Sequence, residues 1–598
     1  MDSNVEEMQK RLGGLQISQK LQGQAKSFSV AEFLDLRAKG NQLFVHGDWK
    51  GAISCYSKCI DFALSSKQEI YKEAMDVLVF CYSNRAEALL KVEEYAKAVE
   101  DCDKALQLHS THLKSLFRKG RALHELKEYN LACLCFRLAL EQSPAAEEIK
   151  SHYEKSKKFN EENQQGKFNL SAYFLNGCRG KDIPEVSNYI GPVIIKKSSV
   201  HGRGLFASKE FEIGDFVLVE NAIAVSGIYR RLTAIAGKEN PSRMIDRLKQ
   251  DTVEKAISCA MGSPRILRQL QDLTNSSWLN ETDVPEMEAF KINNGSWNKF
   301  GENPENLHLN PFELRKAMEF NALIIYITQE EDNPGEPDLS SKGWVFNMKR
   351  ITERCGFWGL ASFINHSCFP NAKYMVVGKA MFIIAVRRIE AGEEITVPYC
   401  RTLAPLVRRE KYCTQMGFRC ECKRCVFERS LGPSFLKLTN EILASHRWLM
   451  GDLANGLTNV SSRDMESLVE LLLQLKKFGA DGEKKHLINA SFVHVYYFVL
   501  SSAMVYVSVQ VLSRLLPTSM EVAEAIQHAV PGSAASLDLF RLLPKVQMDL
   551  HLEKATEDGI TIIGKQKARV LKTLVASKID AVSQSVMRTW NAPDVKSR

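Results

Sequence analysis

The chain has 598 residues, which is too many for one ordinary hydrophobic core and indicates about two to four domains. Its composition, 45% hydrophobic and 25% charged, is ordinary for a soluble globular protein. The net charge of +8 is small for this length and no dense basic block stands out, so the sequence does not indicate a dedicated nucleic-acid binder.

The first residues, MDSNVEEMQKR, contain no apolar stretch, so we expect no secretory signal. Fifteen cysteines, an odd number, favour reduced thiols and metal binding over a disulfide framework. Residues 487–513 contain no Asp, Glu, Lys or Arg, and this segment is long enough to span a bilayer. Because it carries several polar side chains, we expect a helix buried in a bundle, with a membrane span as the alternative.

The first third of the chain repeats one pattern of small and large residues. Gly40, Ala86 and Gly120 mark the same position in three copies, of which the second and third lie 34 residues apart. The first copy precedes the second by 46 residues, so we expect a longer connection within it, near residues 65–74. Further positions that agree between the copies are Leu43, Leu89 and Leu123; Trp49, Tyr95 and Tyr129; Ala52, Ala98 and Ala132; Tyr56, Cys102 and Phe136; and Ile60, Leu106 and Leu140.

Small residues at fixed places allow two helices to cross closely, while large ones fill the groove beside them. This spacing is typical of the tetratricopeptide repeat, which consists of two antiparallel helices. We therefore predict an all-α solenoid over residues 31–165, after an N-terminal tail of residues 1–30. Three units and a capping helix near residues 145–163 would stack into a concave surface.

Five polar residues of these repeats form a second pattern. Arg37 and Asn41 are four residues apart and share a helix face, as do Lys114 and Arg118, while Asn84 occupies the repeat position of Arg118. The set resembles the carboxylate clamp of chaperone-binding tetratricopeptide modules, where the positions hold Lys, Asn, Asn, Lys and Arg. Arg37 departs from that set, with a different shape but the same charge. The resemblance implies binding of heat-shock chaperone C-termini ending in Glu-Glu-Val-Asp; solvated helix residues are the alternative.

Four motifs follow in the middle of the chain. The first, HGRGLFA at residues 201–207, follows a β-rich segment. The others are FINHSCFPN at residues 363–371, GEEITVPY at residues 392–399 and GFRCECKRC at residues 417–425. Each alone is weak, but in this order they resemble the SET domain of protein lysine methyltransferases. The resemblance implies a β-rich SET domain over residues 191–428.

The resemblance is closest to the SET-and-MYND branch and its tetratricopeptide-bearing relatives. In that branch a MYND zinc finger, which needs seven cysteines and a histidine, interrupts the SET domain. The interruption in this chain, residues 228–308, contains one cysteine, Cys259. We therefore expect a SET domain with an insertion but without that finger.

The last motif predicts a metal site. Cys420, Cys422 and Cys425 form a CxCxxC cluster, and three thiolates leave Zn²⁺ one ligand short of its tetrahedral set. In the family the cysteine of the Asn-His-Ser-Cys motif, here Cys368, supplies the fourth ligand. The resemblance implies a post-SET zinc site over residues 413–428, whose binding energy contributes to folding. Four buried core cysteines are the alternative.

Lysine methylation needs a neutral amine, although free lysine has a pKa of about 10.4. A narrow apolar channel lowers that pKa by desolvation, and alignment of the amine with the methyl group of S-adenosylmethionine supplies much of the catalysis. The resemblance assigns the orienting hydroxyl to Tyr399 as the catalytic residue. It assigns cofactor contacts to His201, Arg203, Gly204, Asn321, Asn365, His366 and Phe418.

Three of these residues have simpler interpretations. Phe418 fits a core aromatic, Asn321 a polar residue inside a helix, and His366 a buried histidine. The sequence also departs from many relatives at Val397 and Pro398, where an acidic or polar residue is common before the tyrosine. Proline restricts the preceding residue and removes a backbone donor, so it would alter the wall of the lysine channel.

After a linker (residues 166–190) and the SET domain, helical spacing of Leu, Val and Ala predicts an all-α C-terminal domain over residues 429–598. We therefore expect a multidomain α+β protein, intracellular in the nucleus or cytoplasm. It would methylate lysines of a histone or non-histone protein, with the repeats recruiting a partner. The alternative function is a chaperone-docking adaptor with a non-catalytic SET domain. No specific nucleic-acid or membrane partner is expected.

Overall fold

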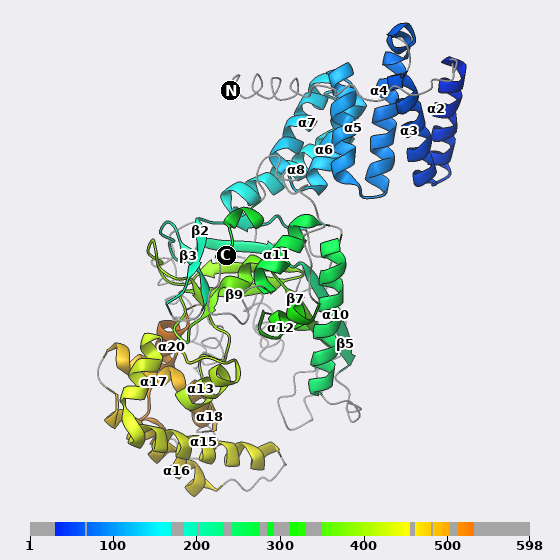
Figure 1. Cartoon of the computed structure of the whole chain (residues 1–598). Coiled ribbons are helices and arrows are strands. Elements are labelled where there is room, and N and C mark those ends of the chain that lie inside the picture. Colours follow the sequence, from blue (N-terminus) through cyan, green and yellow to red (C-terminus); the bar gives the residue numbers. More distant parts are fainter. Residues whose placement is uncertain are drawn as a thin grey trace, which may run out of the picture. The chain divides into compact units, whose positions relative to one another are not determined.

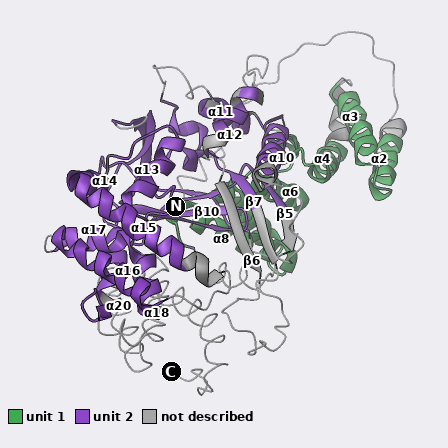
Figure 2. Ribbon diagram, turned by 90° about the horizontal axis from the view of Figure 1, so that it is seen from below, with its two compact units in different colours: residues 1–167, 291–307 green, residues 168–290, 308–598 purple. Residues whose placement is uncertain are grey.

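The computed structural model describes residues 30–65, 68–168, 185–199, 202–231, 241–261, 263–274, 284–291, 311–321, 323–329, 350–454, 461–479, 482–502 and 512–531. The chain divides into two compact units. Residues 1–167 and 291–307 form the first, and residues 168–290 and 308–598 form the second (Figure 2). Each unit has hydrophobic clusters of its own, so we describe each by itself.

The described part of the first unit is entirely helical, and each helix packs against the next (Figure 1). The predicted helical repeats are confirmed. The helices are α2 (Val30–Val45), α3 (Trp49–Ser65), α4 (Gln68–Lys91), α5 (Tyr95–Leu108), α6 (Leu113–Glu125), α7 (Tyr129–Gln142) and α8 (Glu147–Gln165).

The small residues of the repeat lie where paired helices cross. A Cβ atom on Gly40 of α2 would lie 2.7 Å from the ring of Tyr56 in α3, and one on Gly120 of α6 would lie 2.6 Å from the ring of Phe136 in α7. Both rings are almost fully buried. The missing side chain therefore allows each aromatic ring to pack directly on the backbone of the opposite helix.

The extra residues of the first repeat form helix and not the longer connection that we predicted near residues 65–74. Helix α4 begins at Gln68 and extends over 24 residues. Its first turns, QEIYKEAMD, contain no Gly or Pro and several strong helix formers, so the added length continues the helix. The predicted capping helix is confirmed as α8, which ends at Gly166 in a left-handed conformation.

The second unit contains the strands. Its largest sheet has the order β1-β4-β10-β9 with antiparallel pairs, beside a β2–β3 hairpin, a sheet β5-β7-β6 and a short parallel pair β8–β11. The strands are β1 (Tyr189–Ile190), β2 (Val193–Lys197), β3 (Arg203–Ala207), β4 (Phe216–Asn221), β5 (Ala224–Arg231), β6 (Leu323–Gln329), β7 (Arg350–Phe357), β8 (Asn365–His366), β9 (Ala372–Val377), β10 (Ala380–Ala385) and β11 (Thr396–Val397).

The insertion predicted at residues 228–308 begins inside β5, and its described part is largely helical. Helix α10 (Pro241–Met261) packs against β5 and β7, and α11 (Pro264–Thr274) packs against α10. Helix α12 (Pro311–Asn321) follows, and a short 3-10 turn, Met287–Ala289, lies between α11 and α12. Residues of α10 and α11 share one hydrophobic cluster with the strands, so the insertion forms part of the core of this unit.

The helices after residue 405 gather at one side of the strand-rich part (Figure 1) and have a second core of their own. The predicted helical C-terminal part is therefore confirmed over its described residues. Helices α13 (Leu406–Gln415) and most of α14 (Lys423–Ser430) lie in the range predicted for the SET domain. The predicted C-terminal part contains α15 (Gly432–Ala454), α16 (Ser462–Gln474), α17 (Glu483–Ser491), α18 (Val493–Ser502) and α20 (Ser519–Ala529).

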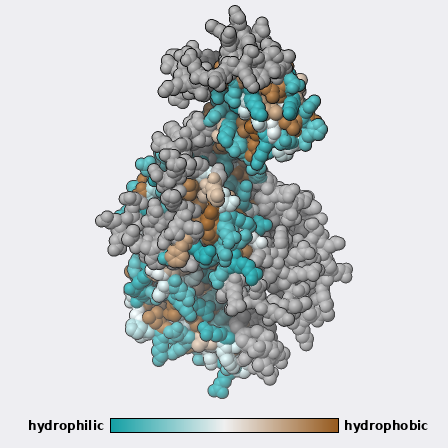
Figure 3. Space-filling view, turned by 45° about the vertical axis from the view of Figure 1, so that its right-hand side comes forward, coloured by the Kyte–Doolittle hydropathy of each residue, from teal (hydrophilic) through white to brown (hydrophobic). Residues whose placement is uncertain are grey.

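The uncharged segment that starts at residue 487 is not one continuous helix. It lies on α17 and α18, which are separated at the fully buried Phe492, and its residues 503–511 lie outside the described part. Among the described helices, none has the length and apolarity that crossing a bilayer requires. On the face that Figure 3 presents, hydrophilic and hydrophobic residues are interleaved over the described parts.

The crossing at Gly120 is testable by substitution. Gly120→Val places side-chain carbon atoms too close to the packed ring of Phe136. We therefore expect a loss of about 1–3 kcal/mol in the free energy of unfolding. Urea unfolding monitored by the helical signal of the repeats measures this loss. Lys97→Val is the matched control, because Lys97 is a 64% exposed side chain of α5; equal losses in both variants would contradict the packing argument.

Candidate functional site

A short parallel strand pair brings two distant motifs together. Asn365 pairs with Thr396 and His366 with Val397. The Ser367 amide donates to the Val397 carbonyl at 3.1 Å, and the Tyr399 amide donates to Nδ1 of His366 at 2.9 Å. The Asn-His-Ser-Cys motif and the segment ending in Tyr399 therefore form one structure.

Asn371 closes this structure from inside. Its amide nitrogen donates to the Glu393 carboxylate at 2.8 Å and to the Glu394 carbonyl at 2.9 Å, while its Oδ1 accepts from the Thr396 amide at 2.8 Å. The side chain is buried, and a buried amide is stable only when its donors and acceptor are paired. Asn371 thus holds the Gly392–Thr396 turn on the motif loop.

Glu394 joins the first motif to these two, and sequence reasoning missed it as a site residue. Its Oε1 accepts from the Asn365 amide at 2.6 Å, and its Oε2 accepts from the Ser198 hydroxyl at 3.0 Å. The same Asn365 amide donates to the Arg203 carbonyl at 3.0 Å. A Cβ atom on Gly204 would lie 2.2 Å from Oε1, so the carboxylate passes directly over the glycine. The sequence feature that could have indicated Glu394 is its position in the Gly-Glu-Glu turn, two residues before β11.

Arg203 lies beside the same loop with its guanidinium over the ring of Phe363, at 4.7 Å from the centroid. Burial lowers the pKa of Arg203 to about 10, and the carboxylate of Asp272 on α11 opposes this shift. The insertion therefore contributes a charge to the surroundings of the first motif.

Tyr399 is oriented by a hydrogen bond from its hydroxyl to the Ile364 carbonyl. Burial raises the pKa of this phenol, so it stays protonated at neutral pH. Its ring lies 6.4 Å from Phe418 and 5.4 Å from His366, measured between centroids. Because the proton is directed at the carbonyl, the lone pairs of the oxygen remain as hydrogen-bond acceptors.

The hydrogen bonds described above do not include two of the expected cofactor residues, Asn321 and His201. Asn321 ends α12, and its amide donates to the Ala317 carbonyl of the same helix at 2.8 Å. His201 lies outside the described residues. A cavity of about 140 Å³ lies between the motif loop and the cysteine segment. Its lining residues are Asn365, His366, Ser367, Glu394, Thr396, Cys420, Glu421 and Cys422.

The four predicted zinc cysteines converge. The sulfur atoms of Cys368, Cys420, Cys422 and Cys425 all lie within 4.8 Å of one another. Zinc holds thiolates at about 2.3 Å, which puts the sulfurs of a tetrahedron about 3.8 Å apart. Cys368, Cys420 and Cys425 are buried and Cys422 is partly buried. The donor set and its spacing therefore fit a structural zinc ion.

His366 and Cys413 lie next to Cys368 and form a second group of potential ligands. Nδ1 of His366 accepts the Tyr399 amide, so in the neutral ring the proton is on Nε2, 3.2 Å from the Cys368 sulfur. That arrangement makes the ring a hydrogen-bond donor to the thiolate. It bridges the cysteine cluster and the Tyr399 backbone.

In the first unit, the predicted clamp residues lie on α2, α4 and α6. Oδ1 of Asn41 accepts from the Asn84 amide at 3.1 Å, and Arg118 donates to Oδ1 of Asn84 at 3.4 Å. Lys114 is exposed on α6, and the Arg37 guanidinium lies over the ring of Phe80 at 5.6 Å. Thus Asn41, Asn84 and Arg118 are linked by a series of hydrogen bonds. The two other basic residues of the predicted clamp, Arg37 and Lys114, lie on α2 and α6.

Sequence reasoning did not anticipate an acidic partner inside this group. Glu87 pairs with Arg118 at 2.9 Å and with Arg121 at 2.9 Å. Burial would raise the pKa of Glu87, but the two guanidinium groups outweigh it and lower the pKa below its usual value. Glu87 therefore stays charged and fixes the direction of the Arg118 side chain.

Comparisons with known proteins agree with this architecture. A model of the SET domain matches residues 202–400, and a model of the tetratricopeptide repeat matches residues 113–145. A methyltransferase of Gibberella zeae is 22% identical over 73% of this chain and 58% of its own length. An Hsp70/Hsp90 co-chaperone of Schizosaccharomyces pombe is 36% identical over 17% of this chain and 27% of its own.

A SET and MYND domain-containing protein of Dictyostelium discoideum is 39% identical over 13% of this chain and 15% of its own length. The chain thus spans less than two thirds of each of these relatives. The resemblance predicted from the motifs is nevertheless confirmed at the level of domains: the chain carries a SET domain and tetratricopeptide repeats.

Proposed function

We propose that the chain transfers methyl groups from S-adenosylmethionine to lysine side chains of a protein substrate. The observation that carries this proposal is the hydrogen-bonded junction of Asn365, Glu394 and the Arg203–Gly204 strand next to Tyr399. The SET domain match and the methyltransferase relative support the same reaction class. When bound, the cofactor would supply an electrophilic methyl group.

The residues of the chain would hold the cofactor and orient the acceptor. Asn365, His366 and the Arg203–Gly204 strand would contact the cofactor, with Phe418 packing against it. The Tyr399 oxygen, whose proton is directed at Ile364, would accept a hydrogen bond from the lysine amine and align its lone pair. Apolar walls would favour the neutral amine, because desolvation lowers the pKa of lysine.

We also propose that Cys368, Cys420, Cys422 and Cys425 hold a structural zinc ion. The cluster joins the motif loop to the segment that carries Phe418, so the metal would fix one wall of the cofactor site.

In the repeats, we propose that Arg37, Asn41, Asn84, Lys114 and Arg118 bind the acidic C-terminus of a heat-shock chaperone. The co-chaperone relative and the convergence of Asn41, Asn84 and Arg118 support that partner.

Cofactor binding is tested by calorimetric titration of the full chain with S-adenosylmethionine. We expect saturable binding that Asn365→Ala weakens at least about tenfold, since a hydrogen bond linking two motifs is lost. Asn163→Ala in α8 is the control and should bind like the wild type. Absence of binding by the folded wild type would refute the enzyme and favour the adaptor, with the repeats as the functional part.

The metal is tested by atomic absorption. Wild-type protein should carry one zinc ion per chain, and the double variant Cys420→Ser, Cys422→Ser should lose it and unfold at lower temperature. The control replaces Cys259, an exposed cysteine in α10, by serine and should keep the metal. Equal metal content in both variants would refute the zinc site.

Chaperone binding is tested with a peptide ending in Glu-Glu-Val-Asp, measured by fluorescence anisotropy. Lys114→Ala should reduce affinity by roughly ten- to a hundredfold, because a charge-assisted contact to a carboxylate is lost. Lys97→Ala, an exposed lysine on α5, should have no effect. The same peptide with a C-terminal amide should not bind; if it binds as well as the free acid, the clamp interpretation is wrong.

A further inference from the structure

Three ionisable side chains are completely buried beside the cysteine cluster. Arg409 of α13 and Arg424 and Glu428 of α14 have 0% of their side chains exposed. Burial of a charge is costly unless partners surround it. The reaction proposed above uses none of these three side chains. Their contacts therefore indicate which segments of the protein they connect.

Arg409 contacts the cysteine cluster directly. Its Nη1 donates to the Cys425 sulfur at 2.9 Å, and its Nε donates to the Ala404 carbonyl at 2.8 Å. Its Nη2 lies 2.7 Å from Oε2 of Glu428, an ion pair without the angular geometry of a hydrogen bond. The guanidinium therefore connects a candidate metal ligand to a buried carboxylate.

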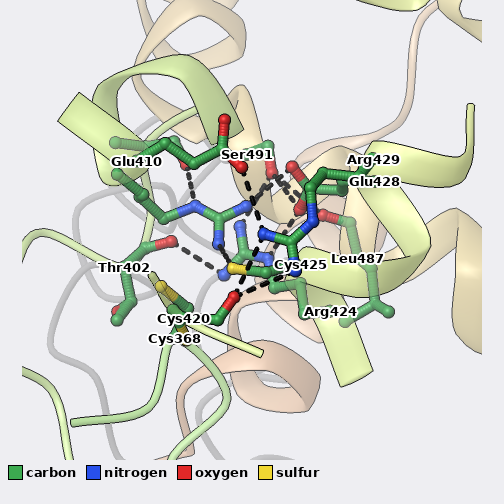
Figure 4. A network of polar contacts seen from close by, with 12 residues as sticks. Cys368, Thr402, Glu410, Cys420, Arg424, Cys425, Glu428, Arg429, Leu487 and Ser491 are labelled. Carbon is green, nitrogen blue, oxygen red and sulfur yellow. Dashed lines mark hydrogen bonds and ion pairs between the residues drawn. The ribbon is translucent and has the colours of Figure 1, made fainter. Parts of the chain in front are cut away.

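The network continues from Glu428 to the C-terminal helices (Figure 4). Oε1 of Glu428 accepts from Nε of Arg424 at 2.9 Å and from the Ser491 hydroxyl at 3.0 Å. Arg424 also donates to the Thr402 carbonyl and to the Ser491 oxygen, both at 2.7 Å. Ser491 is the last residue of α17, so this helix is fixed to the network through one buried hydroxyl.

The net charge of this network is opposite in sign to that of a loaded metal centre. Two guanidinium groups and one carboxylate leave one buried positive charge. A zinc ion with four thiolates carries two negative charges, whereas four neutral thiols carry none. The metal-loaded cluster would therefore compensate the network, and the metal-free cluster would leave a cation without balance in the interior.

We propose that Arg409, Glu428 and Arg424 couple the metal centre to the packing of α17. Loss of the metal then loosens α17, and loss of the α17 contact weakens metal binding by the same factor, because linkage between two equilibria is reciprocal. This inference rests on the proposed zinc centre and is independent of methyl transfer.

The first test follows hydrogen exchange in the full-length protein before and after zinc removal with a chelator. Amides of residues 483–491 should exchange on the order of ten times faster once the metal is gone. Amides of β10 in the central sheet and of α5 in the repeats report global unfolding and should change little. Unchanged exchange in α17 after complete zinc loss would overturn the coupling.

The second test measures the reverse direction. Ser491→Ala removes the hydroxyl that bridges Arg424 and Glu428 while leaving both charges in place. The affinity for zinc, measured by equilibrium competition with a chromogenic chelator, should then fall about tenfold relative to the wild type. Ser467→Ala is the matched control, because Ser467 on α16 bonds only its own helix backbone among its described contacts.

The outcomes are distinguishable from failure of the proposed zinc site. Wild-type chain that folds without metal would refute the zinc centre and the coupling together, and atomic absorption reports this directly. Equal zinc affinity of the metal-loaded Ser491→Ala and Ser467→Ala variants would refute the coupling alone. A selective loss of zinc affinity in Ser491→Ala, with α17 exchange dependent on metal, would support it.

Discussion

The candidate site depends on a parallel pairing of two strands that are only two residues long. Such a pair has too few backbone hydrogen bonds to be stable alone, so side chains must hold it. Asn371 supplies three of these bonds from inside, and Glu394 ties the pair to the first motif. Tyr399 and Asn365 are consequently positioned by hydrogen bonds of buried polar side chains. Removing one partner of such a bond leaves the other partner buried and unpaired, which costs stability.

Beside this pair of strands, charged side chains are buried in the protein interior, where apolar residues are usually found. The cysteine cluster, Arg409 and Glu428 form a continuous set of polar contacts between the motif loop and the last helices. The neighbouring aromatic residues Phe418 and Phe369 give this region its apolar surroundings. In such surroundings charge balance decides which arrangement is stable, because the interior screens charges weakly.

The repeats follow a simpler physical rule. Each helix packs against its neighbours in sequence, so stability is built from local crossings such as that of Gly120 on Phe136. Within the predicted clamp, Asn41, Asn84 and Arg118 of α2, α4 and α6 meet through hydrogen bonds. Because Glu87 pairs with Arg118, part of the positive charge of the clamp is already neutralised before any acidic peptide binds.

Local pattern in the sequence determined the helical repeats and the CxCxxC cluster, because helix crossing and metal ligation depend on residue type and spacing. The resemblance to the SET domain related the four motifs to one another and implied Cys368 as the fourth ligand. Only the tertiary structure decided which motifs meet. Glu394, Glu87 and the Arg409 network have no periodic signal, since their roles arise from contacts between residues far apart in the sequence. The extra residues near position 68 could be interpreted as loop or helix, and the structure shows them as the start of α4. Spacing along a chain specifies elements, whereas buried charge and hydrogen-bond pairing are properties of the folded neighbourhood.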